Sequence, residues 1–187
     1  MIGTLPESLA VCGLEFAIDS DFRTALLICQ AMSDPELSDR DRTYVALRRL
    51  FRKPEELPRF HLHEAAEKAF WFIGGGDAPK SKPEAVRILD WKHDEHMIMP
   101  AVSRALNVTD VRSLPYLHWW TFLGAFGEIG EGLLSQVLHI RQKLARKEKL
   151  EKYERKFLKR SREIIVLRTP EDDAALRETE EVLRNLI

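Results

Sequence analysis

Four side chains that could bind a metal ion lie between residues 90 and 96, namely Asp90, His93, Asp94 and His96. In a helix, residues three or four positions apart share a face, so Asp90 would lie beside both His93 and Asp94. Carboxylate and imidazole groups bind zinc, and such a centre would make the protein a metal-dependent hydrolase. The His-Glu-x-x-His pattern of zinc proteases is absent, however. We therefore expect a solvated charged face, with no metal ion, no cofactor and no catalytic residue.

The cysteines and the other histidines give no support for nucleophilic catalysis. Gly-x-Ser-x-Gly is absent, and neither Cys12 nor Cys29 has a histidine close to it in sequence. Cys12 lies in a strand-like stretch and Cys29 in a helical one, so we expect both to be small core residues in a reducing compartment. His61 and His63 flank the start of a predicted helix, where we expect surface or capping histidines. An enzymatic function is therefore not expected.

The segment from Arg141 to Arg162 could contact phosphate groups, because it holds eleven Lys or Arg residues and three acids. Its aromatic residues Tyr153 and Phe157 lie one helical turn apart, which favours packing over base stacking. The intervening glutamates and the net charge of -1 also disfavour nucleic acid as a partner. A nucleic-acid-binding helical module that uses this basic helix therefore stands as the alternative to a helix that faces a protein.

The segment Tyr116–Phe122 should form the central helix that positions the other elements, because it contains half of the four tryptophans. We expect Ser113 to cap this helix and Pro115 to occupy its first turn. Its apolar side chains are too many for one narrow face: Leu117, Trp119, Trp120, Phe122, Leu123 and Phe126. Such a helix is buried by several neighbours or by a partner. Core packing is the favoured role of the two indoles, and a ligand pocket or a partner groove is the alternative.

Alternation from Leu9 to Ile18 predicts a short β-hairpin or a single strand, with the bend at Gly13 and with Cys12, Leu14, Phe16 and Ile18 on one side. Helical spacing predicts most of the remaining elements. The first expected helix runs from the Asp19-Ser20-Asp21 cap to about Met32, and the second runs from a Ser38 capping box to before Pro54, with Tyr44 buried. The third covers about His63–Ile73, and the fourth begins at about Glu84 and kinks or restarts at Pro100. A further helix covers about Leu133–Leu144. The fold class is therefore mainly α: a helical domain with a short N-terminal β-hairpin and a basic C-terminal helix.

The expected division places a hairpin-plus-helices part at residues 1–73, a Gly- and Lys-rich linker at 74–83, and a helical part with the tryptophans and the basic helix at 84–167. An acidic tail at 168–187, expected to be helical, could pair with the basic helix within one chain or between subunits. The 187 residues contain no apolar stretch of membrane-spanning length and no signal-peptide pattern. These features predict a soluble protein of the cytoplasm.

The motif Leu117-His118-Trp119-Trp120-Thr121-Phe122 resembles the signature of the gene-product-fifteen family of siphophage and prophage tail-assembly proteins. In that family an Asp-x-x-x-Asp helix precedes the signature, as Asp90 and Asp94 do here, and an arginine helix and a basic segment follow it, as Arg141 and the basic run do. The N-terminal half is also similar, in Val11-x-Gly13-x-x-Phe16-x-Ile18 and in Asp21-Phe22-Arg23. The resemblance covers about Leu5 to Ile165.

The resemblance implies a small, mostly helical, non-enzymatic protein that acts during tail morphogenesis in the cytoplasm of the bacterial host. Its implied role is that of a chaperone that coats the hydrophobic tape-measure protein. The major tail protein and a second copy of the chain are further implied partners. The implied family-motif or partner-facing residues are Leu117, His118, Trp119, Trp120, Phe122, Asp90, Asp94 and Arg141. Covering a long apolar helix would prevent its aggregation, and several copies along it would gain from avidity.

Overall fold

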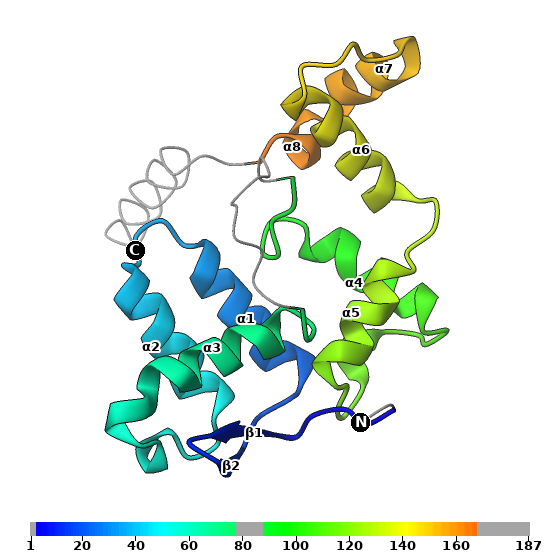
Figure 1. Cartoon of the computed structure of the whole chain (residues 1–187). Helices are drawn as coiled ribbons and strands as arrows, with labels where there is room; N and C mark the ends of the chain where they lie inside the picture. Colours follow the sequence, from blue (N-terminus) through cyan, green and yellow to red (C-terminus); the bar gives the residue numbers. More distant parts are fainter. Residues whose placement is uncertain (1–2, 78–87, 168–187) are drawn as a thin grey trace, which may run out of the picture. The chain divides into compact units, whose positions relative to one another are not determined.

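The computed structural model describes residues 3–77 and 88–167, and it confirms a mainly α protein with one antiparallel β-hairpin (Figure 1). The chain forms two compact units. Within the described residues, unit 1 contains residues 3–77 and 90–135, and unit 2 contains residues 88–89 and 136–167. Residues on both sides of the expected linker therefore belong to unit 1. The acidic tail at 168–187 and most of the expected linker lie outside the described residues.

The hairpin consists of β1 (Ser8–Val11) and β2 (Leu14–Ala17), joined by Cys12 and Gly13. Both turn residues have positive φ, 52° and 74°, which is the backbone of a two-residue type I′ turn. Glycine adopts this conformation without strain, so the bend predicted at Gly13 is confirmed. The carboxylate of Glu64 accepts a hydrogen bond from the Cys12 backbone N–H and ties the turn to α3 (Leu62–Ile73).

The predicted side of the hairpin is wrong for Cys12 only, because Leu14 and Phe16 pair with Val11 and Leu9 and so share their side of the sheet. Cys12 is exposed in the turn, so it is not the core residue expected from the sequence, and the side chain of Leu14 is 61% exposed. The turn occupies two positions and thereby shifts the alternation between the strands. Consequently Leu9 and Val11 of β1 are the buried residues, and Ile18 beyond β2 is buried beside Phe51, with which it forms an isolated bridge.

Three helices follow in unit 1, and the starts of the first two were correctly predicted from local capping residues, whereas α3 begins without a side-chain cap. The Asp21 carboxylate caps α1 (Phe22–Ser33) by accepting from the Arg23 N–H. Ser38 and Asp41 form the predicted capping box of α2 (Asp39–Leu50). Helix α1 packs on α2, α2 packs on α3, and β1 packs on α3. The large core residues here include Phe22, Ile28, Leu50, Phe51 and Phe72.

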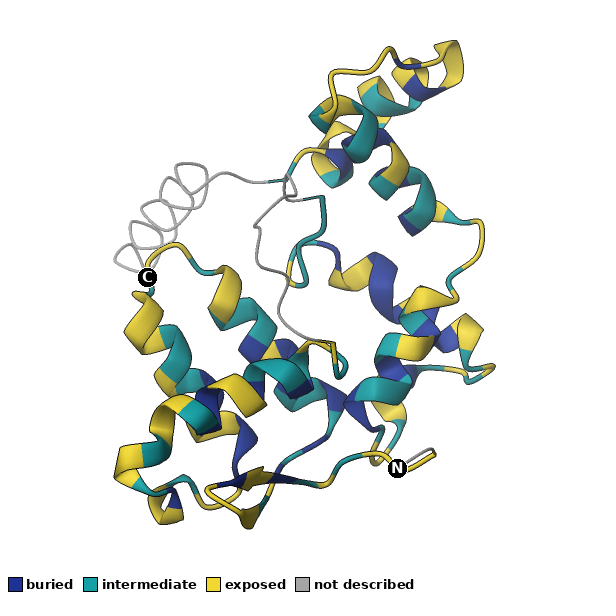
Figure 2. Cartoon of the chain, viewed as in Figure 1, coloured by how far each residue is buried: buried dark blue, intermediate teal, exposed yellow. Residues whose placement is uncertain are grey.

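Tyr44 of α2 is 63% exposed, so its predicted burial is wrong. The buried side of α2 is formed by Ala46, Leu47 and Leu50 instead, and Arg42 bonds across to the Asp34 backbone carbonyl. Two single 3₁₀ turns, η1 (Pro54–Glu56) and η2 (Arg59–His61), connect α2 to α3. Figure 2 shows that the helices of unit 1 combine buried and exposed positions along their length, as amphipathic helices do.

Helix α4 runs over Glu95–Ala105, and residues 91–94 before it form a turn, so the helix expected from about Glu84 does not continue without a break to Pro100. The expected start near Glu84 lies outside the described residues. Pro100 lies inside α4, and the helix continues through it without a restart. The η3 turn (Val111–Ser113) follows, and Ser103 accepts a hydrogen bond from the Val111 N–H. Helix α5 (Trp119–Gly127) then packs on both α1 and α4.

Helix α6 covers Leu133–Ala145, and its residues from Gln136 onward belong to unit 2. The predicted basic helix is divided into α7 (Lys152–Arg160) and α8 (Arg162–Ile165). Lys147, which has a φ of 57°, lies in the connection between α6 and α7. Among the described residues, no helix is both long and apolar enough to span a membrane.

Candidate functional site

The two motifs that carry the family resemblance lie side by side in unit 1, although nearly a hundred residues separate them in sequence. The Phe22 N–H donates to the Leu117 carbonyl at 2.9 Å, and the Trp119 N–H donates to the Ser20 carbonyl at 2.8 Å. Asp21 and His118 form an antiparallel bridge between these two bonds. The starts of α1 and α5 are therefore joined by a short stretch of extended backbone pairing.

Side chains of both motifs strengthen this junction. One carboxylate oxygen of Asp21 caps α1, and the other accepts from the Leu117 N–H at 3.2 Å. The Arg23 guanidinium pairs with Asp21 at 2.9 Å and donates to the carbonyls of Arg112 and Leu114. The Asp21-Phe22-Arg23 motif thus fixes the chain that leads into the His-Trp-Trp motif.

Phe22 of the same motif stacks on Phe122, with ring centroids 4.9 Å apart. Both rings are fully buried, and the Ser20 hydroxyl lies 2.7 Å from the Tyr116 hydroxyl. Aromatic stacking of this kind adds about 0.5–1.5 kcal/mol beyond the burial of apolar area. The junction therefore combines backbone, ionic and aromatic contacts.

His118 is the N-cap of α5, and this corrects the predicted start of the helix at Ser113 and Pro115. Its Nδ1 accepts from the Trp120 N–H at 3.0 Å, and its Nε2 lies 3.0 Å from the Pro6 carbonyl oxygen. Because a carbonyl can only accept, these partners assign the proton to Nε2. Residues 116–118 are extended because they pair with the start of α1, a long-range contact that local capping signals do not reveal.

The two neighbouring indoles cap the carboxyl end of α3. The Nε1–H of Trp119 donates to the Ile73 carbonyl at 2.9 Å, and that of Trp120 donates to the Phe72 carbonyl at 2.8 Å. The last carbonyls of a helix lack partners within the helix and need donors from elsewhere. Adjacent tryptophans supply two such donors, so the pair has a structural task that neither residue could perform alone.

The glycines at the end of α3 allow this close approach. Gly75 and Gly76 have φ values of 78° and 92°, and a Cβ at Gly76 would lie 3.0 Å from the Trp120 ring. A Cβ at Gly75 would lie 3.1 Å from Leu123. Residues 74–76, which we expected to be part of a linker, thus end α3 and form part of the packing against α5.

The four tryptophans and Phe126 belong to two groups of contacting rings in unit 1, one with Trp71 and Trp120 and one with Trp91, Trp119 and Phe126, and we call these five residues together the aromatic cluster. Trp71 contacts Trp120 at 5.3 Å between centroids, and Trp91 contacts Trp119 at 6.0 Å and Phe126 at 5.2 Å. Of these residues only Trp119 is buried, and the other four are half-buried. The cluster therefore leaves aromatic surface exposed on unit 1.

The carboxylates of the predicted metal-binding segment stabilise a turn. Asp90 accepts from the backbone N–H groups of Lys92 and His93 at 2.8 and 2.7 Å. The fully buried Asp94 accepts from the Asp90 N–H at 2.9 Å and precedes α4. No group of three or more metal-binding side chains occurs in residues 3–77 and 88–167.

His61 and His63, at the start of α3, form pairs within that helix start. His61 lies 3.3 Å from Glu64 and His63 lies 3.5 Å from Glu67.

Arg141, the arginine of the family pattern, is buried in unit 2 at 6% exposure. Its guanidinium donates to the carbonyls of Ile88, Ile164 and Ile165 at 2.7 to 2.9 Å. Two of these carbonyls belong to α8 and close its carboxyl end. A planar guanidinium with five N–H groups suits this bridging role better than lysine would.

Glu154 is the second buried charged group of unit 2, and it joins α7 to α6. Its Oε1 lies 2.7 Å from Lys143 Nζ and 3.3 Å from His139 Nε2, and its Oε2 accepts from the Glu151 N–H. The hydrogen bond from Lys143, followed by the backbone bond from Glu151, holds the pKa of Glu154 below its ordinary value. The same bond raises the pKa of Lys143.

Trp71 and Trp91 of the aromatic cluster were not singled out from the sequence, because their partners come from distant segments. Trp71 directly precedes Phe72 and Ile73, whose carbonyls accept hydrogen bonds from Trp120 and Trp119. This position in the sequence becomes informative only once the contact between α3 and α5 is known.

The comparisons with known proteins gave one family. The sequence pattern of the family described as Bacteriophage Gp15 protein matches residues 1–167, which includes both motifs of the junction and the buried Arg141. None of the curated proteins and none of the solved structures matched the chain. The match covers far more than half of the sequence, and the chain therefore belongs to the Bacteriophage Gp15 protein family.

Proposed function

We propose that this phage protein is a tail-assembly chaperone that binds the tape-measure protein through the aromatic cluster of unit 1. The observation that carries the proposal is that four of the five rings in the cluster are half-buried. Aromatic residues dominate the energy of protein interfaces, and tryptophan is the most enriched among them. A rigid aromatic surface suits the apolar face of a long helix.

The geometry around the cluster supports recognition of a helix. Trp71 comes from α3 and Trp120 from α5, and the glycine turn at residues 74–76 lies between their chain segments without side chains of its own. Gly124 and Gly127 of α5 are exposed and would let a partner backbone come close. Apolar helices bind partner surfaces through residues at helical spacing.

The alternative roles of the predicted site residues are less compatible with this surface. In the described conformation Trp119, Phe122 and His118 are buried and bonded within unit 1, so they support the surface from beneath. A metal-dependent hydrolase centred on Asp90 and Asp94 would need carboxylates that the turn before α4 uses for its own backbone.

The test is to produce the tape-measure protein of the same phage alone and together with this chain. We expect the tape-measure protein to be insoluble alone, since its long apolar helix would aggregate, and to become soluble and co-purify when this chain is present. Several copies of the chain should bind each tape-measure molecule. A tape-measure protein that stays insoluble in both cases, with no co-purification, would refute the proposal.

A further inference from the structure

The solvent-facing side of α7 in unit 2 carries cations only. With about 100° between successive residues, five of the nine side chains fall within an arc of roughly 140°. These residues, which we call the basic face, are all exposed: Lys152, Arg155, Lys156, Lys159 and Arg160. The acid of the helix, Glu154, points to the opposite side and is buried against Lys143.

The cations of the basic face have no acidic partners within the described part of the chain. The ion pairs of unit 2 instead join Glu154 to Lys143 and His139, and Glu148 to Arg146. Five like charges on one short helix repel one another, so an anionic partner would relieve that repulsion. The face is thus complementary in charge to an extended anion.

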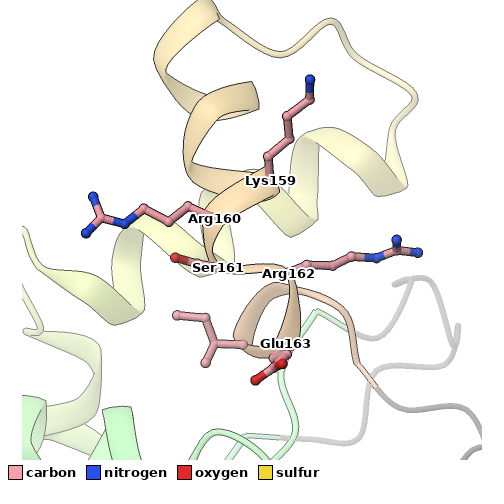
Figure 3. A pocket seen from close by; sticks show the side chains of 6 residues that line it. Lys159, Arg160, Ser161, Arg162 and Glu163 are labelled. Carbon is pink, nitrogen blue, oxygen red and sulfur yellow. The ribbon is translucent and has the colours of Figure 1, made fainter.

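The shape at the end of α7 argues against a single small anion. A hollow of about 390 Å³ lies between α7 and α8, lined by Lys159, Arg160, Ser161, Arg162, Glu163 and Ile164. Figure 3 shows that Lys159, Arg160 and Arg162 extend away from one another rather than toward a common point. The Glu163 carboxylate at the same hollow would also repel an anion held there. The cations therefore suit charges that are spread along a chain.

Two extended anions could bind the basic face, an acidic protein and a nucleic acid. The basic face has no apolar centre, and this favours the nucleic acid. Stable protein interfaces have a desolvated apolar or aromatic core. The basic face has none, since the exposed Tyr153 borders it and Phe157 and Leu158 turn inward and are half-buried. A phosphate backbone needs no such core, because neutralised phosphates release condensed counterions and this release supplies the affinity.

We propose that the basic face of α7 binds the phosphate backbone of nucleic acid without sequence preference. The helix is about 13 Å long, which corresponds to the axial rise of about four nucleotides in one DNA strand. This inference does not depend on the proposed tape-measure binding, because it uses unit 2 and the aromatic cluster belongs to unit 1.

The test measures binding of the full chain to a fluorescent duplex DNA as a function of salt concentration. Five phosphate contacts predict a slope of log K against log salt of about −4 to −5. Changing Lys152, Lys156 and Lys159 to Gln should reduce the slope to about −2, since each lost contact removes about one unit. A second DNA of unrelated sequence should bind equally well.

The matched control changes three exposed cations of unit 1, Arg40, Arg48 and Arg49, to Gln and so lowers the net charge by the same amount. This control should bind DNA like the wild type. The proposal is overturned if the wild type does not bind DNA at about 50 mM salt, or if both triple variants lose binding equally. It is also overturned if polyglutamate binds to the basic face and DNA does not, which would assign the face to an acidic protein.

Discussion

His118 illustrates how a family-motif residue can serve the fold. Its ring joins the start of α5 to the Pro6 carbonyl, with both nitrogens bonded. His118→Ala should therefore lower the free energy of unfolding by about 2 kcal/mol, since it removes a helix cap and leaves the half-buried Pro6 carbonyl without the His118 donor. His118→Asn keeps a capping oxygen and should cost clearly less. Denaturant unfolding curves measure both, and equal losses in the two variants would contradict the capping role.

Gly76 tests the packing of the glycine turn against Trp120. Gly76→Ala combines a φ of 92° with a Cβ at 3.0 Å from the indole, so we expect a loss of more than about 1 kcal/mol in unfolding free energy. Gly124→Ala is the matched control, because that glycine lies inside α5 and its Cβ would meet open space. Gly124→Ala should raise the free energy of unfolding by about 0.5–1 kcal/mol. Thermal unfolding that ranks the two variants in the opposite order would refute this account of the turn.

Trp120 is half-buried, so its replacement should cost less than that of a fully buried tryptophan. Trp120→Ala removes packing against Trp71 and Phe72 and the donor to the Phe72 carbonyl. We expect a loss of about 2–3 kcal/mol, below the range of about 3–5 kcal/mol for complete burial. A loss near zero in chemical unfolding would show that the indole does not cap α3.

At the scale of elements, α6 and α7 should separate in acid. Lys143 lowers the pKa of Glu154 in the folded state. The stability that the ionised Glu154 contributes is therefore present above its unfolded pKa and is lost as the pH falls through its folded pKa. Because the pKa of Lys143 is raised, the stability that its charged form contributes is present below its unfolded pKa and is lost only at strongly alkaline pH. The contact is therefore complete across the neutral range.

Amide hydrogen exchange of α7 measures this pH dependence directly. All four tryptophans lie in unit 1, so tryptophan fluorescence would not follow the change in unit 2. We expect protection of α7 to fall below about pH 4.5 in the wild type. In Glu154→Gln that acid-dependent fall should be absent, and an unchanged acid profile in this variant would exclude Glu154 as its cause.

The sequence predicted elements well where the determining contacts are local. The caps of α1 and α2, the turn at Gly13 and the mainly α class follow from neighbouring residues. The start of α5 and the core position of Cys12 were wrongly predicted, because each depends on pairing or turn geometry that shifts the pattern. The capping of α3 by two indoles could not be predicted, since nothing near Ile73 in sequence indicates which distant segment donates to it.

For the whole molecule, two surfaces of different chemistry lie on different compact units. The aromatic cluster belongs to unit 1, and the basic face belongs to unit 2. Membership of the Bacteriophage Gp15 protein family, over residues 1–167, includes both. Both proposed partners could therefore be bound by one chain without competition for the same residues.

The most direct test of the central claim compares two aromatic substitutions in co-purification with the tape-measure protein. Trp71→Ala removes a half-buried ring of the aromatic cluster, and Phe60→Ala removes a fully exposed ring of η2 in the same unit. With folding verified by circular dichroism, Trp71→Ala should lower the affinity at least about tenfold, as loss of an aromatic hot spot does. Phe60→Ala should bind like the wild type. Equal affinity of Trp71→Ala and the wild type would contradict the assignment of the aromatic cluster as the binding surface.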